Sequence, residues 1–223
     1  MITMLSKETF NFLKTLGKNN NRDWLQANKK EFENAKADFA GFVGELIAGI
    51  SRFDPEVSGL APDACIFRIY RDIRFSKDKS PYKTHFGAYI SPGGRKINSP
   101  GYYIHVQPGG QSFLAAGKHM PEPKELLLIR QAVAGKTAEF LSVVENKRFR
   151  ERFGELHGEK LKTAPKGFPA DHPAIEYLKF KSFTVATGQE KDKAVTSADF
   201  PRNVLSTFKE TKPLIDFLRK ALA

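Results

Sequence analysis

The chain contains only one cysteine, Cys65, among its 223 residues, so an intramolecular disulfide is excluded, which fits a reducing compartment. The first residues, Met-Ile-Thr-Met-Leu-Ser-Lys-Glu, contain no basic stretch followed by a long apolar run, so we expect no signal peptide. No window approaches the ~18 uninterrupted apolar residues that a membrane-spanning helix needs. These absences predict a cytoplasmic protein with no membrane association.

The sequence also lacks the patterns that mark metal, phosphate-loop and nucleophile sites. Its five histidines show neither H-x-x-x-H nor H-E-x-x-H spacing, and we expect no metal site. The pairs Gly93-Gly94 and Gly109-Gly110 do not match a phosphate loop and indicate turns. No G-x-S-x-G elbow occurs, and Cys65, next to Ile66-Phe67, is interpreted as a core residue. The sequence identifies no cofactor.

Apolar residues and positive charge are plentiful. Apolar residues make up 40% of the chain, including 19 Phe, which is sufficient for a substantial core. The formal net charge is +11, an excess that often accompanies polyanionic partners such as nucleic acid. The alternative is a Lys-rich surface that serves solubility alone.

Residues 6–53 have a helical pattern. Ser6 is a suitable N-cap for a first helix that ends at Gly17 and the following asparagines. Asp23 is expected to cap a second, longer helix, which Asp54-Pro55 ends. Its apolar stripe consists of Phe32, Ala35, Phe39, Phe42, Leu46 and Phe53.

The composition changes over residues 64–117, where β-branched and aromatic residues alternate with polar ones. We expect four strands, at about 64–75, 85–91, 101–107 and 111–117. The turns Pro92-Gly93-Gly94 and Pro108-Gly109-Gly110 are too short for crossover helices, so the sheet should be mainly antiparallel.

Helical spacing returns over residues 121–144 and is followed by a basic, loop-like stretch at 146–172. We expect a short helix within 173–181, a fifth strand at 183–187, and two helices within 199–222 that meet near Pro213. The sequence therefore predicts one α+β domain over residues 1–223. It has a mixed or mainly antiparallel sheet of about five strands, with N- and C-terminal helices packed on one side.

The densest chemistry lies between Phe67 and His85. If this segment begins as a strand, one face carries Arg68, Tyr70, Asp72 and Arg74. A turn then brings Lys77, Lys79 and Lys83 close to the arginines, which together suit a phosphate or carboxylate. The alternative is a salt-bridge lattice of Arg68, Arg71 and Arg74 with Asp63, Asp72 and Asp78. Exposed pairs of that kind contribute only ~0–1 kcal/mol each, and both interpretations stay open.

The stretch Arg68-Ile69-Tyr70-Arg71-Asp72-Ile73-Arg74-Phe75-Ser76-Lys77-Asp78-Lys79-Ser80-Pro81-Tyr82-Lys83-Thr84 resembles the signature of the domain of unknown function 2461 family of bacteria and fungi. A later block, from Leu161-Lys162 through Pro165-Lys166-Gly167-Phe168 and Asp171-His172-Pro173 to Tyr177-Leu178, is also similar to that family. The resemblance implies a shared α+β fold and a shared function that is not assigned, so no catalytic residue can be transferred from it.

Three hypotheses follow. The first is a binding module for a phosphate-bearing small molecule or nucleic acid, with charge from Arg68, Arg71, Arg74, Lys79 and Lys83 and with ring contacts from Tyr82 and Tyr103. The second is an enzyme acting on a phosphate or acyl substrate, with Asp72 or His105 as the acid–base. Here His105 shares a strand face with Tyr103 and Gln107. The third is a structural or assembly protein in which the charged motif is an internal lattice. The sequence indicates no oligomeric state.

Overall fold

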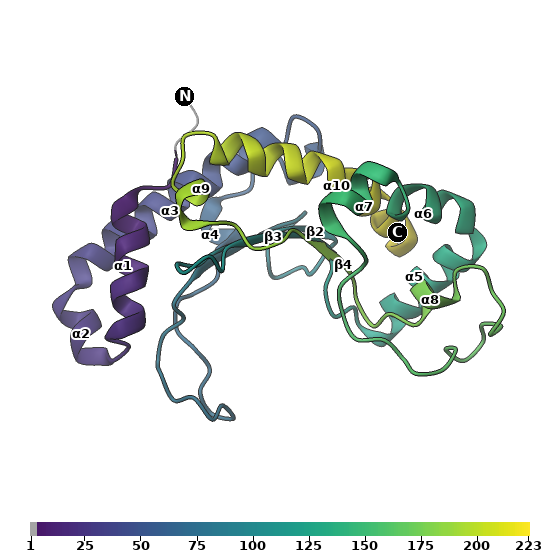
Figure 1. The fold of residues 1–223 in the computed structure, drawn as a ribbon, viewed down its shortest axis with the longest axis horizontal. Helices are drawn as coiled ribbons and strands as arrows, with labels where there is room; N and C mark the ends of the chain where they lie inside the picture. Colours follow the sequence, from purple (N-terminus) through teal and green to yellow (C-terminus); the bar gives the residue numbers. More distant parts are fainter. Residues whose placement is uncertain (1–3) are drawn as a thin grey trace.

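A computed structural model describes residues 4–223 (Figure 1). The four strands are β1 (Phe86–Ile90), β2 (Gly101–Val106), β3 (Phe113–Lys118) and β4 (Phe183–Ala186). They form one sheet in that order, with every neighbouring pair antiparallel. The α+β class and the antiparallel pairing are thus confirmed, and the expected number of strands was one too high. No helix within the described range is both long and apolar enough to cross a membrane.

The N-terminal helices are α1 (Lys7–Lys18), α2 (Arg22–Ala27) and α3 (Lys29–Ile50). As expected, Ser6 caps α1, its hydroxyl accepting a 3.1 Å hydrogen bond from the Thr9 amide. The expected second helix is divided into α2 and α3 at Asn28, whose side-chain amide donates to the Trp24 carbonyl and competes with the backbone ladder. Asn21 rather than Asp23 caps α2.

One face of the sheet forms the core. Figure 1 shows α3 and α10 (Phe200–Leu222) lying across this face, as expected for helices from both ends of the chain. Strand residues on this side are almost fully buried: Ala88, Ile90, Tyr102, Ile104, Val106, Leu114, Ala116, Phe183 and Val185. The opposite face is turned toward the space beneath the arch that the helices form (Figure 1).

The strand expected at 64–75 was wrong. A 3-10 turn (Pro55–Val57) and the short helix α4 (Pro62–Cys65) lead into an irregular excursion, residues 67–85, which we call the arm. Only its base is paired: the Phe67 amide donates to the Gly87 carbonyl, and Tyr70 and Tyr82 form an isolated bridge. Beyond that bridge the charged residues have no neighbouring strand and bury no apolar face. Alternation alone therefore did not make a strand here.

The C-terminal half contains α5 (Pro123–Gly135), α6 (Thr137–Val144), α7 (Lys147–Phe153), α8 (Ile175–Leu178) and α9 (Asp192–Val195). Helix α7 lies in the stretch expected to be a loop, because Phe149 and Phe153 share one helical face and are both buried. Helix α10 is also a correction, since it continues through Pro213 instead of dividing there. Apolar residues on both sides of Pro213 bury against the same core, which offsets the ~3 kcal/mol that an interior proline costs.

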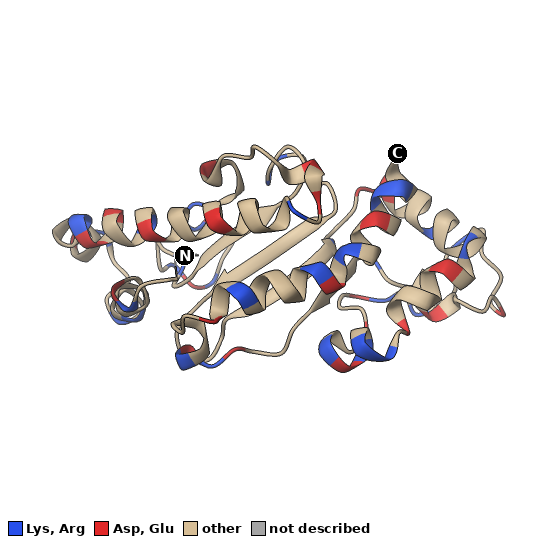
Figure 2. Ribbon diagram, turned by 90° about the horizontal axis from the view of Figure 1, so that it is seen from above, with Lys and Arg blue, Asp and Glu red and all other residues tan. Residues whose placement is uncertain are grey.

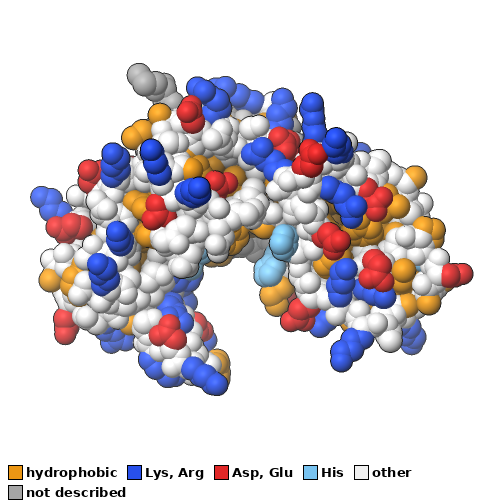
Figure 3. Space-filling view, in the orientation of Figure 1, with side chains coloured by type: hydrophobic (Ala, Val, Ile, Leu, Met, Phe, Trp, Pro, Cys, Tyr) orange, Lys and Arg blue, Asp and Glu red, His pale blue; other side chains and the backbone are white. Residues whose placement is uncertain are grey.

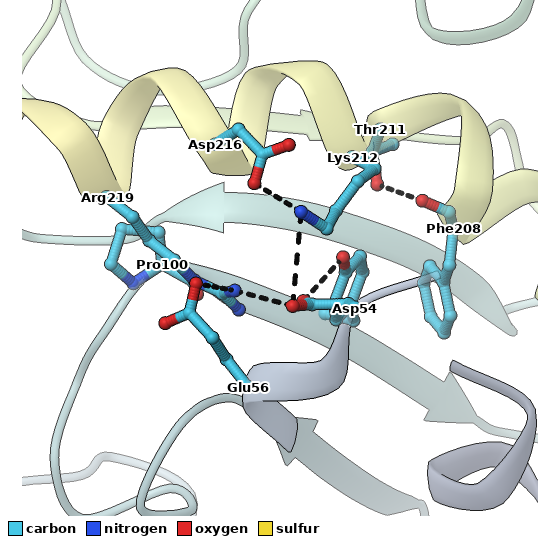
Figure 4. A network of polar contacts seen from close by, with 9 residues as sticks. Asp54, Glu56, Pro100, Phe208, Thr211, Lys212, Asp216 and Arg219 are labelled. Carbon is cyan, nitrogen blue, oxygen red and sulfur yellow. Dashed lines mark hydrogen bonds and ion pairs between the residues drawn. The ribbon is translucent and has the colours of Figure 1, made fainter. Parts of the chain in front are cut away.

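A buried carboxylate fastens α10 to the sheet (Figure 4). Asp54, which is 0% exposed, accepts hydrogen bonds from the Tyr102 hydroxyl at 2.9 Å and from Arg219 Nη1 at 2.8 Å. Arg219 Nε donates in turn to the Pro100 carbonyl at 3.1 Å. Because Tyr102 lies in β2 and Arg219 in α10, this network joins the sheet, the end of α3 and the C-terminal helix.

Replacing Asp54 by Ala should strongly destabilise the fold. The change removes the buried partner of the Arg219 guanidinium and leaves it only the exposed Glu56 carboxylate at 3.3 Å. Loss of one partner of a buried ion pair typically costs roughly 3–5 kcal/mol of unfolding free energy. Urea denaturation measures this loss. The matched control is Asp199→Ala, which removes a carboxylate paired with Arg202 at the surface. Equal stability changes in the two variants would contradict a central role for the Asp54 network.

Candidate functional site

The space-filling view shows a hollow on the underside of the molecule, with histidine side chains on its walls (Figure 3). The floor of this hollow is the sheet face that α3 and α10 do not cover. We call it the open face. Strand register places its residues side by side, pairing Gly87 with His105, His105 with Phe113, Tyr103 with Ala115, and Ala115 with Ala186. The side chains of Tyr103, His105 and Phe113 are only half-buried, so they present ring surface to solvent.

Aromatic and imidazole rings form a continuous cluster on the open face. The ring centroids of His85 and His105 are 4.1 Å apart, and His105 stacks on Phe113 at 4.7 Å. Tyr103 adjoins Phe113 at 5.8 Å and Phe67, at the base of the arm, at 6.2 Å. The cluster therefore spans from the arm across β2 to β3.

Small residues determine where these rings lie. A Cβ atom at Gly87 would be 2.8 Å from the Tyr103 hydroxyl, which is closer than real Cβ contacts allow. Gly87 therefore lets the Tyr103 side chain lie flat across β1. On the far side of Tyr103 and His105, the open face continues with Ala115 and Ala186, which project little above the sheet. The rings of Tyr103, His105 and Phe113 therefore lie beside the small residues Ala115 and Ala186, which leaves a step on the floor of the hollow.

A chain of hydrogen bonds fixes the tautomer of His105. Gln107 Nε2 donates to Gln111, so its Oε1 faces His105 Nε2 at 2.8 Å and must accept from it. His105 Nδ1 is then unprotonated and accepts from the Tyr103 hydroxyl at 2.9 Å. Both ring nitrogens of His105 are thus hydrogen-bonded to neighbouring side chains.

Both histidines of the cluster prefer the neutral form. Burial lowers the pKa of His85 to about 4, with further contributions from His105 and Lys83. Burial also lowers the pKa of His105, although the Gln107 hydrogen bond partly opposes the shift. At neutral pH the open face therefore presents uncharged rings.

Lys83 lies beside this cluster, and Arg68 is close enough to Lys83 to affect its ionisation. Neither Arg68 nor Lys83 forms an ion pair among residues 4–223. Lys83 Nζ lies 5.5 Å from the centroid of the Phe67 ring. Burial lowers the pKa of Lys83, and the nearby charge of Arg68 lowers it further. By contrast, the ribbons of α3 and α10 seen from above carry both signs of charge (Figure 2).

The other charged residues predicted for the site are occupied within the arm. Arg71 donates to Asp78 and Ser80, and Arg74 pairs with Asp72 through Nε at 2.9 Å and Nη2 at 2.6 Å. The Arg74 hydrogen bonds lower the pKa of Asp72, which keeps that carboxylate ionised. Lys79 Nζ donates to the Ile73 carbonyl at 3.0 Å.

The predicted residues therefore do not converge on one hollow. Arg68 lines a cavity of about 410 Å³ between α3 and the arm. Arg71 and Tyr82 line another of about 540 Å³ beside α2. The Tyr82 ring is buried, and the Asn20 side chain both donates to the Tyr82 carbonyl and accepts from the Tyr82 amide. Tyr82 thus anchors the arm to the loop between α1 and α2.

Sequence reasoning placed Tyr103 and His105 on a common face with Gln107, and the hydrogen-bond chain confirms that arrangement. It missed His85, Phe113 and the exposed position of Phe67. The pairing of the strands at 101–107 and 111–117 carried a signal for Phe113, because it lies opposite His105 in the register. Alternation puts Phe67 on the face opposite Arg68 and Tyr70, which a strand here would have buried, but that strand does not form. In the part of the chain that the structure covers, no group of three His, Cys, Asp or Glu side chains is arranged to hold a metal ion.

Comparison with protein-family models gives one match, described as "Conserved hypothetical protein (DUF2461)", over residues 8–217. Comparison with curated proteins and with solved structures gave no match.

The depressed pKa of His85 predicts a specific loss of stability in acid. The unfolded chain, with a His pKa near 6.5, binds a proton more readily than the folded protein, with a pKa of about 4. The neutral form is therefore fully compatible with folding above pH 6.5, and stability falls as the pH drops from 6.5 through 4. Urea denaturation across this range should show a smaller decrease for His85→Phe than for the parent protein. Identical pH dependence in both proteins would show that His85 is not held neutral.

Proposed function

Since the chain belongs to the family of conserved hypothetical proteins (DUF2461), whose description names no activity, we propose its function from the geometry of the site. The protein is a binding module for an anionic ligand that carries a phosphate and a planar ring. The phosphate lies beside Lys83, where the charge of Arg68 also acts on it, and the ring lies on the open face beside Tyr103 and His105. A nucleotide unit has this combination of groups.

The observation that carries the proposal is the pair of cations without carboxylate partners. Two like charges that are close enough to affect one another's ionisation repel, and the partial burial of Lys83 adds a desolvation cost. A bound phosphate relieves both penalties, because it restores hydrogen bonds and opposite charge. Arg71 and Arg74 have no such need, since acids within the arm already pair with them.

The ring cluster supplies the second half of the ligand's chemistry. Stacking on exposed rings is worth roughly 1–3 kcal/mol per base and tolerates any base, because each has a π face. Tyr103 and Phe113, which are both only half-buried, offer such ring surface on the open face. Neutral imidazoles are suitable stacking surfaces, because a charged imidazolium beside Lys83 would add a third repelling cation.

The same contacts favour binding over acid–base chemistry. A general base needs a free lone pair within reach of its substrate. Both nitrogens of His105 are hydrogen-bonded to Tyr103 and Gln107, and the Asp72 carboxylate is held by Arg74. The two acid–base candidates are thus engaged with other side chains.

Titration with thymidine monophosphate at low salt, followed by NMR, tests this proposal. Signals of Tyr103 and His105 should shift, and Arg68→Ala and Lys83→Ala should each weaken binding about tenfold, as expected for the loss of a charged hydrogen bond. The matched control is Arg74→Ala, which removes the same charge from the same arm but from a residue paired with Asp72.

Two outcomes would contradict the proposal. One is the absence of any shift on the open face at millimolar nucleotide. The other is an equal loss in all three variants, which would mean that the ligand responds to the overall positive charge and not to the two unpaired cations.

A further inference from the structure

The arm ends in an aromatic side chain that the fold does not use. Phe75 is 95% exposed, whereas most of the chain's other phenylalanines lie in the core. Burying a phenylalanine side chain is normally worth roughly 1.5–3 kcal/mol, so leaving one in water at the end of a projecting segment forgoes that gain. A partner that covers Phe75 would recover it.

The surroundings of Phe75 are cationic. The Arg74 guanidinium lies 5.8 Å from the centroid of the Phe75 ring and is held in place by the Asp72 carboxylate. The arm contains only two aspartates but six Arg and Lys residues: Arg68, Arg71, Arg74, Lys77, Lys79 and Lys83. A ring flanked by fixed positive charge suits a partner that offers both planar groups and negative charge.

The arm also connects this tip with the floor of the hollow. Its base holds Phe67 and Lys83 beside the ring cluster, while its far end extends away from the sheet (Figures 1 and 3). A ligand that occupies both ends must therefore follow the arm. A single nucleotide on the open face can fill only one of the two positions.

We infer that the ligand is a single-stranded nucleic acid, with one base on the open face, its backbone along the arm and a second base stacked on Phe75. This inference rests on the proposed function, because it assumes that the open face takes a nucleotide unit. Unpaired bases expose the planar faces that Tyr103 and Phe75 require, whereas a duplex keeps its bases stacked inside. The aromatic floor is recessed in a hollow, which a broad lipid surface does not enter.

Fluorescence anisotropy with a labelled oligothymidylate of about 12 nucleotides, within the usual span of single-strand binding folds, provides the test. The oligonucleotide should bind at least tenfold more tightly than thymidine monophosphate. Phe75→Ala should weaken oligonucleotide binding about fivefold or more, the loss of one base stack, and should leave mononucleotide binding unchanged. The control is Leu127→Ala, which removes a side chain that is 47% exposed on α5.

The outcomes separate this inference from the proposed function. Mononucleotide binding with no gain for the oligonucleotide, or equal effects of Phe75→Ala and Leu127→Ala, would overturn the inference and leave the binding module intact. Loss of binding to anionic phospholipid vesicles in Phe75→Ala, with oligonucleotide binding unchanged, would assign the tip to a membrane surface instead and would also overturn it. A protein that binds neither nucleotide form removes both proposals.

Discussion

Burial of a single face of the antiparallel sheet beneath α3 and α10 is the constraint on which the rest of the structure depends. The buried Asp54 network fastens α10 to β2, so the helices cannot move to the other side without leaving a charge unpaired in the core. The second face is consequently left without a covering layer, and its rings lie in a hollow. A sheet normally covers such a surface with helices or with polar side chains. Here it carries Tyr103, His105 and Phe113, the rings beside which we propose that the ligand lies.

The outer part of the arm neutralises some of its own charge. Its two aspartates are used by Arg71 and Arg74, which hold the irregular backbone in shape away from the sheet. Arg68 and Lys83, at the base of the arm, form no ion pair among residues 4–223, and their like charges repel. The two interpretations of the charged motif, lattice and ligand site, are thus divided along its length: the outer part is a local lattice, and the proposed site is limited to the base.

Much of the fold could be predicted because the strands are short, apolar and bounded by turns, and because β2 and β4 alternate between buried and partly exposed residues. The segment 64–75 also alternates, but it has no neighbouring strand that completes its ladder. The predicted break at Pro213 was wrong for a related reason. The free energy gained by burying α10 against the core exceeds the local cost of the proline. Alternation placed Tyr103 with His105, but it cannot say which sheet face the helices cover. The sequence also could not predict which aspartate pairs with Arg71 and which with Arg74, because these pairs depend on the irregular backbone of the arm.

Photo-cross-linking addresses the central claim, that the uncovered sheet face is the binding surface. A thiothymidine monophosphate irradiated with the protein forms a covalent bond with side chains that contact its base, and peptide mass spectrometry locates them. The account predicts adducts on Tyr103, His105 or Phe67, and their loss in the presence of excess unmodified nucleotide. Adducts confined to the outer surfaces of α3 and α10, or adducts that excess nucleotide does not reduce, would contradict it.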